Sequence, residues 1–374
     1  MAVHRLMLSD APRMNFYHAA LSNRTVIEGR VVVDVGAGTG VLSLWSVLHG
    51  HAKHCFSFEA SPLSSTLQQL AVANGAGEDR MTVIARRVED VIEEGPDAFV
   101  ARYPWLAVAG GVDVVVSEWM GFYLVHECML PSVVAARDFF REVNALIASQ
   151  RGSSGAPSVK PVRMIPDHAA IYAAPVNLDR LRAQSFEGTY NAAVNTPLSN
   201  SKELAPLNFG LLGQLEYEAR MSSGVNPLVD VIPPACLLAA GKKILEWSLE
   251  AVTIAETLRL SDMSATFAFD ASHYDENTQG LHGFVLWFDV SAVGTDVTGS
   301  SSPPLTLTTS PHAPPTHWKQ CVLQLDPENG WRGNDILIPA GTKMRAQFAA
   351  VCEDIATRQY TLTVELGDDE EQDE

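Results

Sequence analysis

The sequence predicts two domains of different class, an α/β domain followed by a mainly β domain. Three observations support this prediction. The chain of 374 residues is too long for one ordinary hydrophobic core. Short apolar runs alternate with helical patterns over the first 140 residues, as in a mostly parallel sheet. After about residue 225 apolar residues instead recur at every second position, which is typical of antiparallel strands.

Four apolar runs form the predicted parallel sheet of the first domain. They cover residues 30–35, 54–59, 81–85 and 112–117. Between the first two runs, apolar residues repeat at helical spacing over residues 41–48, and they do so again over residues 63–70. We therefore expect βα units in which helices cover the sheet.

The boundary between the domains is predicted within residues 149–161, which are rich in serine, glycine and proline. This division gives domains of residues 1–160 and 161–374. Strand-like runs of the second domain cover residues 244–254, 264–270, 282–291, 319–325, 343–352 and 360–366, enough for a sandwich or barrel. Residues 178–222 lack a strong period and are predicted to leave the core. Residues 367–374 predict a solvated acidic tail.

Composition limits the partners of the chain. Its formal net charge of −18 repels nucleic-acid phosphate and anionic lipid, whereas it attracts cationic peptides. The five cysteines include no C-x-x-C pair, so we expect neither structural zinc nor a disulfide framework. The start lacks the apolar core of a signal peptide, and no run approaches the roughly 18 apolar residues of a membrane span. We therefore expect a cytoplasmic or nuclear protein that binds neither nucleic acid nor membrane.

A glycine motif follows the first predicted strand. The sequence VVVDVGAGTG places Asp34 at the strand end and Gly36, Gly38 and Gly40 before an amphipathic helix. Glycines allow a ligand to approach the backbone, and a helix N-terminus carries partial positive charge. A dinucleotide fingerprint would need glycine where Val41 stands, so the motif favours S-adenosylmethionine. The alternative is a plain turn between strand and helix.

Acidic residues follow the next two predicted strands. Glu59 ends the second strand, where an acid can accept hydrogen bonds from both ribose hydroxyls of a nucleoside. Val88 and Glu89 follow the third strand, where an apolar wall and an acceptor could hold adenine. Surface glutamates are the alternative interpretation, and a lone Val-Glu pair is commonplace.

The segment SEWMGFYLVHECML, residues 117–130, follows the fourth predicted strand at the ligand-binding edge of the sheet. One loop there connects Glu118 to Glu127. Two carboxylates folded back in this way can hold a planar guanidinium by bidentate, charge-assisted hydrogen bonds. Surface charges flanking a helix are the alternative, but the apolar surroundings argue against simple exposure. If the two carboxylates are close, we expect repulsion to raise the pKa of at least one.

Together these motifs resemble the protein arginine methyltransferase family. The family's double-glutamate loop has the pattern S-E-W-M-G followed by E-x-M-L. The likeness continues at the T-H-W loop of residues 316–318, at NPLVDV (226–231) and at MIPD (164–167), so it spans nearly the whole chain. It implies a Rossmann-like methyltransferase domain followed by a β-barrel. A helical dimerisation arm, here about 178–222, would be inserted in the barrel of a homodimer.

The resemblance also implies roles for individual residues. Met7 looks like the active-site methionine, Arg13 like the binder of the cofactor carboxylate, and Asp10 like the acid that pairs with His317. Catalysis would depend on Glu118, Glu127, His317 and Asp10. Met7, Met120 and Trp318 would contact the substrate.

The chemistry implied is methyl transfer from S-adenosylmethionine to arginine-rich proteins such as histone or RNA-binding-protein tails. The guanidinium, with a pKa of about 13 or more, must arrive charged. Either Glu127 or the Asp10–His317 pair could accept the proton released afterwards. Slim methionines at positions 7 and 120, together with the T-H-W loop of residues 316–318, resemble the class that makes monomethyl and asymmetric dimethyl arginine, type I.

One departure from the family favours an alternative function. The aromatic Y-F-x-x-Y helix expected before Met7, which covers the cofactor in the family, has no counterpart among the six preceding residues. The alternative is therefore a catalytically weak scaffold subunit that stabilises an active partner.

Overall fold

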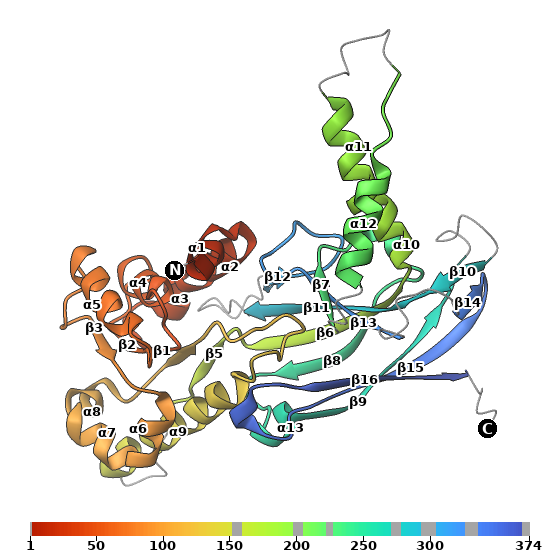
Figure 1. Cartoon of the computed structure of the whole chain (residues 1–374). Coiled ribbons are helices and arrows are strands. Elements are labelled where there is room, and N and C mark those ends of the chain that lie inside the picture. The colour runs from red at the N-terminus through yellow and green to blue at the C-terminus, as the bar shows by residue number, and fades with distance from the viewer. Residues whose placement is uncertain are drawn as a thin grey trace, which may run out of the picture.

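The computed structural model describes residues 2–151, 159–196, 205–221, 227–270, 278–292, 304–325 and 336–368. A parallel sheet with its helices forms one end of the molecule, antiparallel strands form the other, and a helical arm projects from the antiparallel part (Figure 1). This arrangement confirms the predicted α/β-plus-β class. No helix in the described ranges is both long and apolar enough to cross a bilayer.

The parallel sheet has the strand order β3-β2-β1-β4-β5. Its strands are β1 (Val31–Val35), β2 (His54–Phe58), β3 (Met81–Ile84), β4 (Val114–Val116) and β5 (Arg163–Ile165). The first four confirm the predicted strands. The fifth extends the parallel sheet beyond residue 160, and the division of the chain into domains at that residue stays a prediction.

Helices pack around this sheet, and its central strands β1, β2 and β4 are buried along their whole length. They are α1 (Ala2–Ser9), α2 (Ala11–Leu21), α3 (Arg24–Ile27), α4 (Val41–Leu48), α5 (Leu63–Ala73), α6 (Val88–Glu94), α7 (Pro96–Arg102), α8 (Trp105–Ala109) and α9 (Leu130–Gln150). Residues 152–158, within the predicted boundary segment, lie outside the described residues.

The antiparallel part contains a six-stranded sheet and a three-stranded sheet, with a separate β10-β14 pair. The larger sheet has the order β7-β13-β11-β6-β8, with β12 paired to β11, and the smaller has the order β16-β15-β9. The strands are β6 (His168–Val176), β7 (Leu228–Asp230), β8 (Lys242–Ser248), β9 (Arg259–Ala268), β10 (Thr278–Leu281), β11 (Gly283–Ala292), β12 (Leu305–Thr308), β13 (Gln320–Gln324), β14 (Ile336–Pro339), β15 (Lys343–Val351) and β16 (Thr361–Asp368). The acidic tail beyond Asp368 lies outside the described residues.

The predicted strand of residues 244–254 is wrong in its second half. Strand β8 ends at Ser248, and helix α13 (Ile254–Leu258) begins a few residues later. Thr253 accepts a hydrogen bond from the Glu256 amide, and the Glu256 carboxylate accepts one from the Thr253 amide. This capping box starts a helix, and it outweighs the apolar run that suggested a longer strand.

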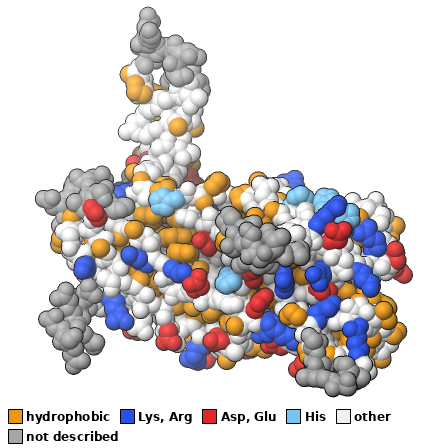
Figure 2. All heavy atoms as spheres, turned by 180° about the vertical axis from the view of Figure 1, so that it is seen from behind, with side chains coloured by type: hydrophobic (Ala, Val, Ile, Leu, Met, Phe, Trp, Pro, Cys, Tyr) orange, Lys and Arg blue, Asp and Glu red, His pale blue; other side chains and the backbone are white. Residues whose placement is uncertain are grey.

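Within the predicted arm of residues 178–222, the described residues 178–196 and 205–221 form the projecting arm of Figure 1. Its helices are α10 (Leu178–Leu181), a π-helical turn Arg182–Glu187, α11 (Gly188–Asn195) and α12 (Gly210–Met221). Leucines 211, 212 and 215 of α12 are exposed, and hydrophobic side chains are visible on the arm in Figure 2. The predicted excursion from the core is therefore a helical hairpin with apolar surface.

A buried arginine joins the two parts of the molecule. Arg137 of α9 is 3% exposed, and its Nη1 donates to the carbonyl oxygens of Leu249 at 2.7 Å and Val252 at 2.9 Å. Both acceptors lie in the turn after β8, so this guanidinium ties the helix of the parallel domain to the antiparallel strands.

Candidate functional site

A cavity of about 660 Å³ opens where β1, β2 and β4 end. Helix α1, the glycine loop, the start of α6 and the hairpin after β4 contribute to its wall. The predicted site residues on this wall are Met7, Arg13, Gly36, Gly38, Glu59, Val88, Glu89, Glu118 and Glu127. Residues from five separate segments therefore meet at one edge of the sheet, where ligands bind in open α/β folds.

The glycine loop needs its glycines for two physical reasons. Gly36, Gly38 and Gly40 have φ values of 76°, 55° and 79°, in the left-handed region that other residues rarely adopt. A methyl group added at Gly36 would also overlap the terminal methyl of Met129. The loop thus brings bare backbone to the cavity.

Glu59 is held by the backbone around this loop. Its carboxylate accepts hydrogen bonds from the Gly38 amide at 2.7 Å and from the Ser61 amide at 2.8 Å. Each oxygen of an ionised carboxylate can accept more than one hydrogen bond, so acceptor capacity remains for ligand hydroxyls.

Glu118 is buried and paired with Arg13. Its side chain is 7% exposed, and Arg13 donates to its Oε2 from Nη2 at 3.0 Å and from Nε at 3.3 Å. Burial raises the pKa of Glu118, opposed by the charges of Arg13 and His317, while Glu127 adds the smallest contribution. The direction agrees with the expectation for the glutamate pair, but burial is the main cause rather than repulsion.

Glu127 lines the same cavity, but its backbone has an unusual conformation. Glu127 has a φ of 76° and the next residue, Cys128, a φ of 49°, although neither is glycine. Two successive non-glycine residues with positive φ store strain that surrounding structure must support. In contrast to Glu118, Glu127 is exposed.

Two further contacts connect the antiparallel part to this site. The Nδ1 atom of His317 lies 2.6 Å from Asp10 Oδ2, which also accepts the His317 amide at 2.8 Å. Burial would raise the pKa of Asp10, but hydrogen bonds from His317 and from the Arg13 amide more than offset it, so the pKa is lowered. The indole Nε1 of Trp318 donates to the Met120 carbonyl at 2.8 Å.

Six of the predicted site residues are not on the cavity wall: Asp10, Asp34, Gly40, Met120, His317 and Trp318. Asp34 is fully buried behind the loop, where its Oδ2 accepts a hydrogen bond from the Ser43 hydroxyl at 2.6 Å. Burial raises the pKa of Asp34 to about 7. Gly40 instead packs against Leu67, leaving no room for a side chain.

Sequence reasoning missed other residues of the site. Tyr17 is buried beside Arg13, and its hydroxyl donates to the Ser117 carbonyl at 3.0 Å. Arg86 and Arg358 also line the cavity. The R-x-x-x-Y spacing within α2, which places Arg13 and Tyr17 one helical turn apart, was a signal for the tyrosine.

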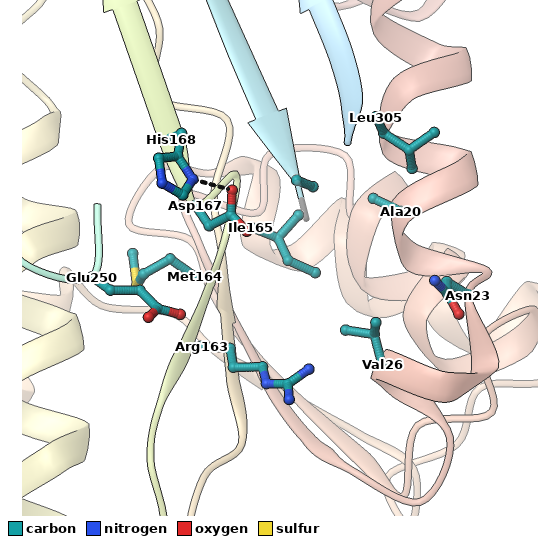
Figure 3. Close-up of a pocket in the computed structure, with 11 residues that line it drawn as sticks. Ala20, Asn23, Val26, Arg163, Met164, Ile165, Asp167, His168, Glu250 and Leu305 are labelled. Atoms are coloured by element: carbon teal, nitrogen blue, oxygen red, sulfur yellow. Dashed lines mark hydrogen bonds and ion pairs between the residues drawn. The ribbon is translucent and has the colours of Figure 1, made fainter. Parts of the chain in front are cut away.

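A second cavity of about 340 Å³ lies between α2–α3 and the antiparallel strands (Figure 3). Arg163, Asp167, His168 and Glu250 line it, and His168 Nδ1 lies 2.8 Å from Asp167 Oδ1. None of the predicted site residues lines this cavity.

Comparisons with known proteins agree with the geometry. Residues 167–344 match the family model of the arginine methyltransferase oligomerization subdomain. The chain is 30% identical over 328 residues to protein arginine N-methyltransferase 6 of Danio rerio, covering 87% of this chain and 76% of that protein. The crystal structure of PRMT6 with SAH superposes with a TM-score of 0.79 at 34% identity, covering 98% of this chain and 99% of that chain. The Trypanosoma brucei PRMT1 enzyme–prozyme complex shares the fold at 22% identity, with a TM-score of 0.64 and coverage of 97% and 96%.

Proposed function

The chain belongs to the protein arginine N-methyltransferase family, and we propose that Glu118 and Glu127 hold the substrate guanidinium in its 660 Å³ cavity. As a member of this family it transfers methyl groups from S-adenosylmethionine to arginine in proteins. One observation carries the assignment of the two glutamates: both carboxylates line the same cavity as the glycine loop.

S-adenosylmethionine fits the residues of the cavity. Bare backbone at Gly36 and Gly38 admits the nucleoside side, and the fixed carboxylate of Glu59 is an acceptor for ribose hydroxyls. Val88 and Glu89 would hold adenine, and Arg13 would hold the cofactor carboxylate. When bound, the sulfonium supplies an electrophilic methyl group.

The glutamates would orient the acceptor and keep its charge in place. A guanidinium has a pKa of about 13 or more, so it enters as a cation. Bidentate hydrogen bonds to Glu118 and Glu127 would concentrate positive charge on the gripped nitrogens and leave the remaining terminal nitrogen more nucleophilic. The proton released after transfer would pass to Glu127 or to the Asp10–His317 pair.

Product type follows from the space around the acceptor nitrogen. Met7 lines the cavity, whereas Met120 is buried and does not. Slim side chains at both positions support room for a second methyl on one nitrogen and hence asymmetric dimethylarginine. Mass spectrometry of a glycine- and arginine-rich peptide after reaction separates the three products. Symmetric dimethylarginine would contradict the proposal.

Oligomerisation is supported by the matched subdomain, and a homodimer joined through the arm is the specific form proposed. The exposed leucines 211, 212 and 215 of α12 supply apolar surface for such a contact. A cytoplasmic or nuclear location is part of the same proposal and is supported by five free cysteines.

The test is transfer of a labelled methyl group to arginine-rich protein tails by the wild type and by Glu127→Gln. We expect clear incorporation by the wild type and a loss of about 10²–10³-fold in the variant. Glu250→Gln is the matched control, because it removes the same charge from the second cavity (Figure 3). Equal activity of the two variants would contradict the assigned site. Cofactor binding without turnover in the wild type would instead favour the scaffold alternative.

A further inference from the structure

Two cysteines from distant parts of the chain meet behind the glutamate hairpin. Cys128 follows Glu127 directly, and Cys352 follows the end of β15. Their Sγ atoms are 3.5 Å apart, although 224 positions separate the residues in sequence. Both residues are buried, with exposures of 4% and 7%. Two sulfurs at this separation need only a small movement to form a bond.

We propose that Cys128 and Cys352 form an oxidation site, at which an intrachain disulfide displaces Glu127 and switches off arginine binding. The effect on activity rests on the proposed role of Glu127, whereas formation of the bond does not. Cys55 offers a contrast within the same chain, because its sulfur faces the Ser57 hydroxyl at 3.8 Å.

The oxidant is a peroxide. The thiolate of one cysteine attacks the O–O bond of hydrogen peroxide, giving a sulfenic acid and, after protonation, one water molecule. The second sulfur then attacks the sulfenic sulfur, the S–S bond forms, and a second water molecule leaves. Two thiols and one peroxide thus give one disulfide and two waters, and a dithiol reductant reverses the change by thiol–disulfide exchange.

Formation of the disulfide would move the hairpin that carries Cys128 rather than strand β15, which precedes Cys352. A disulfide needs its sulfurs about 2.05 Å apart, so they must approach by more than 1 Å. Cys352 is fixed, since its amide donates to the Leu258 carbonyl at 2.9 Å and β15 pairs with strands on both sides. Cys128 instead belongs to the strained pair of positive-φ residues that includes Glu127, and its amide donates to the Val125 carbonyl at 3.0 Å within the same hairpin, so the hairpin can move as a unit. The displacement is therefore transmitted to the neighbouring carboxylate.

The Cys352 thiol is protonated at neutral pH. Burial raises the pKa of Cys352 to about 11, and the neighbouring Cys128 thiol and Asp354 charge act in the same direction. Tyr123 and Tyr360 also border the pair, and burial raises the pKa of both phenols. Because the thiolate is the reacting form, attack on peroxide by Cys352 should be slow at neutral pH and faster at alkaline pH.

The experiment treats the reduced full-length protein with hydrogen peroxide and follows both mass and activity. We expect a species lighter by two hydrogen atoms and a protease fragment that joins the peptides of Cys128 and Cys352. Methyl transfer should fall about 10²-fold, because a shift of about 1 Å in a positioning group can cost that much. Calorimetry should show S-adenosylmethionine still binding, and dithiothreitol should restore activity.

Matched variants identify the cysteines responsible. Cys352→Ser should keep basal activity and resist peroxide, whereas Cys236→Ser, which removes another buried cysteine, should stay as sensitive as the wild type. Absence of the cross-linked fragment, or equal sensitivity of Cys352→Ser and wild type, would overturn the proposal. If Cys352→Ser does not fold, the presence or absence of the cross-linked fragment in the oxidised wild type still tests the proposal. A reduced protein without activity would contradict the proposed function and leave the cross-link measurable.

Discussion

The two ends of the hairpin after β4 carry the same charge in opposite physical settings. Glu118 lies at the end of a buried strand, is 7% exposed and is held by the guanidinium of Arg13. Glu127 is exposed and stands on backbone with a φ of 76°. One carboxylate is therefore positioned by a side-chain partner and the other by its own backbone. The charge of Glu118 is balanced without substrate, and the two acids should respond differently to the same substitution.

The largest effect is expected for Glu118→Gln, which should reduce both activity and stability. It leaves Arg13, itself 5% exposed, without its charged partner. Breaking a buried ion pair costs about 3 kcal/mol, and loss of the acceptor contact should lower kcat/KM about 10²–10³-fold. Urea unfolding and methyl-transfer kinetics measure the two effects. An unchanged unfolding midpoint would show that the ion pair does not position this acid.

Glu127→Gln should separate activity from stability. We expect a similar 10²–10³-fold loss in kcat/KM, because the acceptor charge is removed. The free energy of unfolding should change by less than about 0.5 kcal/mol, since the side chain is exposed. A destabilisation as large as that of Glu118→Gln would show that Glu127, like Glu118, is held by contacts that stabilise the fold.

Asp10→Asn tests the contact that joins the start of α2 to His317. The lowered pKa of Asp10 means that its ionised form stabilises the fold above the unfolded pKa of about 3.9, and that this contribution is lost as pH falls through the folded pKa. The variant should be about 2 kcal/mol less stable at pH 7. The difference should shrink below about pH 4. Denaturant titrations across pH, with exposed Asp262→Asn as control, check this. A difference independent of pH would contradict it.

The smallest effect is expected for Tyr17→Phe. The variant leaves the ring beside Arg13 but removes the hydroxyl that donates to the Ser117 carbonyl at 3.0 Å. Loss of one buried hydrogen bond costs about 1 kcal/mol, and activity should fall only a few-fold. A loss comparable to that of Glu127→Gln would assign Tyr17 a direct part in positioning Glu118.

The sequence predicted the parts of the site that are local. A strand followed by three glycines predicts the loop, because its conformation depends on nearby residues alone. The pairing of Glu118 with Arg13 could not be predicted from spacing, since 105 positions separate them and tertiary packing brings them together. Family resemblance assigned Arg13 a different partner, the cofactor carboxylate.

The fold also contains elements that local sequence patterns could not predict. The central strand β6 pairs with both β8 and β11, yet its mostly buried HAAIYAAPV sequence has no period-two pattern. A strand covered on both faces loses the alternation that identifies half-buried strands. Asp34 illustrates the converse, because its place in the motif suggested a ligand contact while its side chain turns into the core toward Ser43.

The guanidinium of Arg137 restricts how this enzyme can admit a protein chain. Rotating the antiparallel half away from α9 would break the two hydrogen bonds from Arg137 to carbonyl groups, each worth about 1.5–3 kcal/mol for a charged donor, while Asp138 on the same helix would keep the guanidinium paired. Hinge opening is thereby disfavoured. We therefore expect a substrate arginine to enter the 660 Å³ cavity without separation of the two parts, which would favour arginines in extended tails over arginines fixed within folded domains.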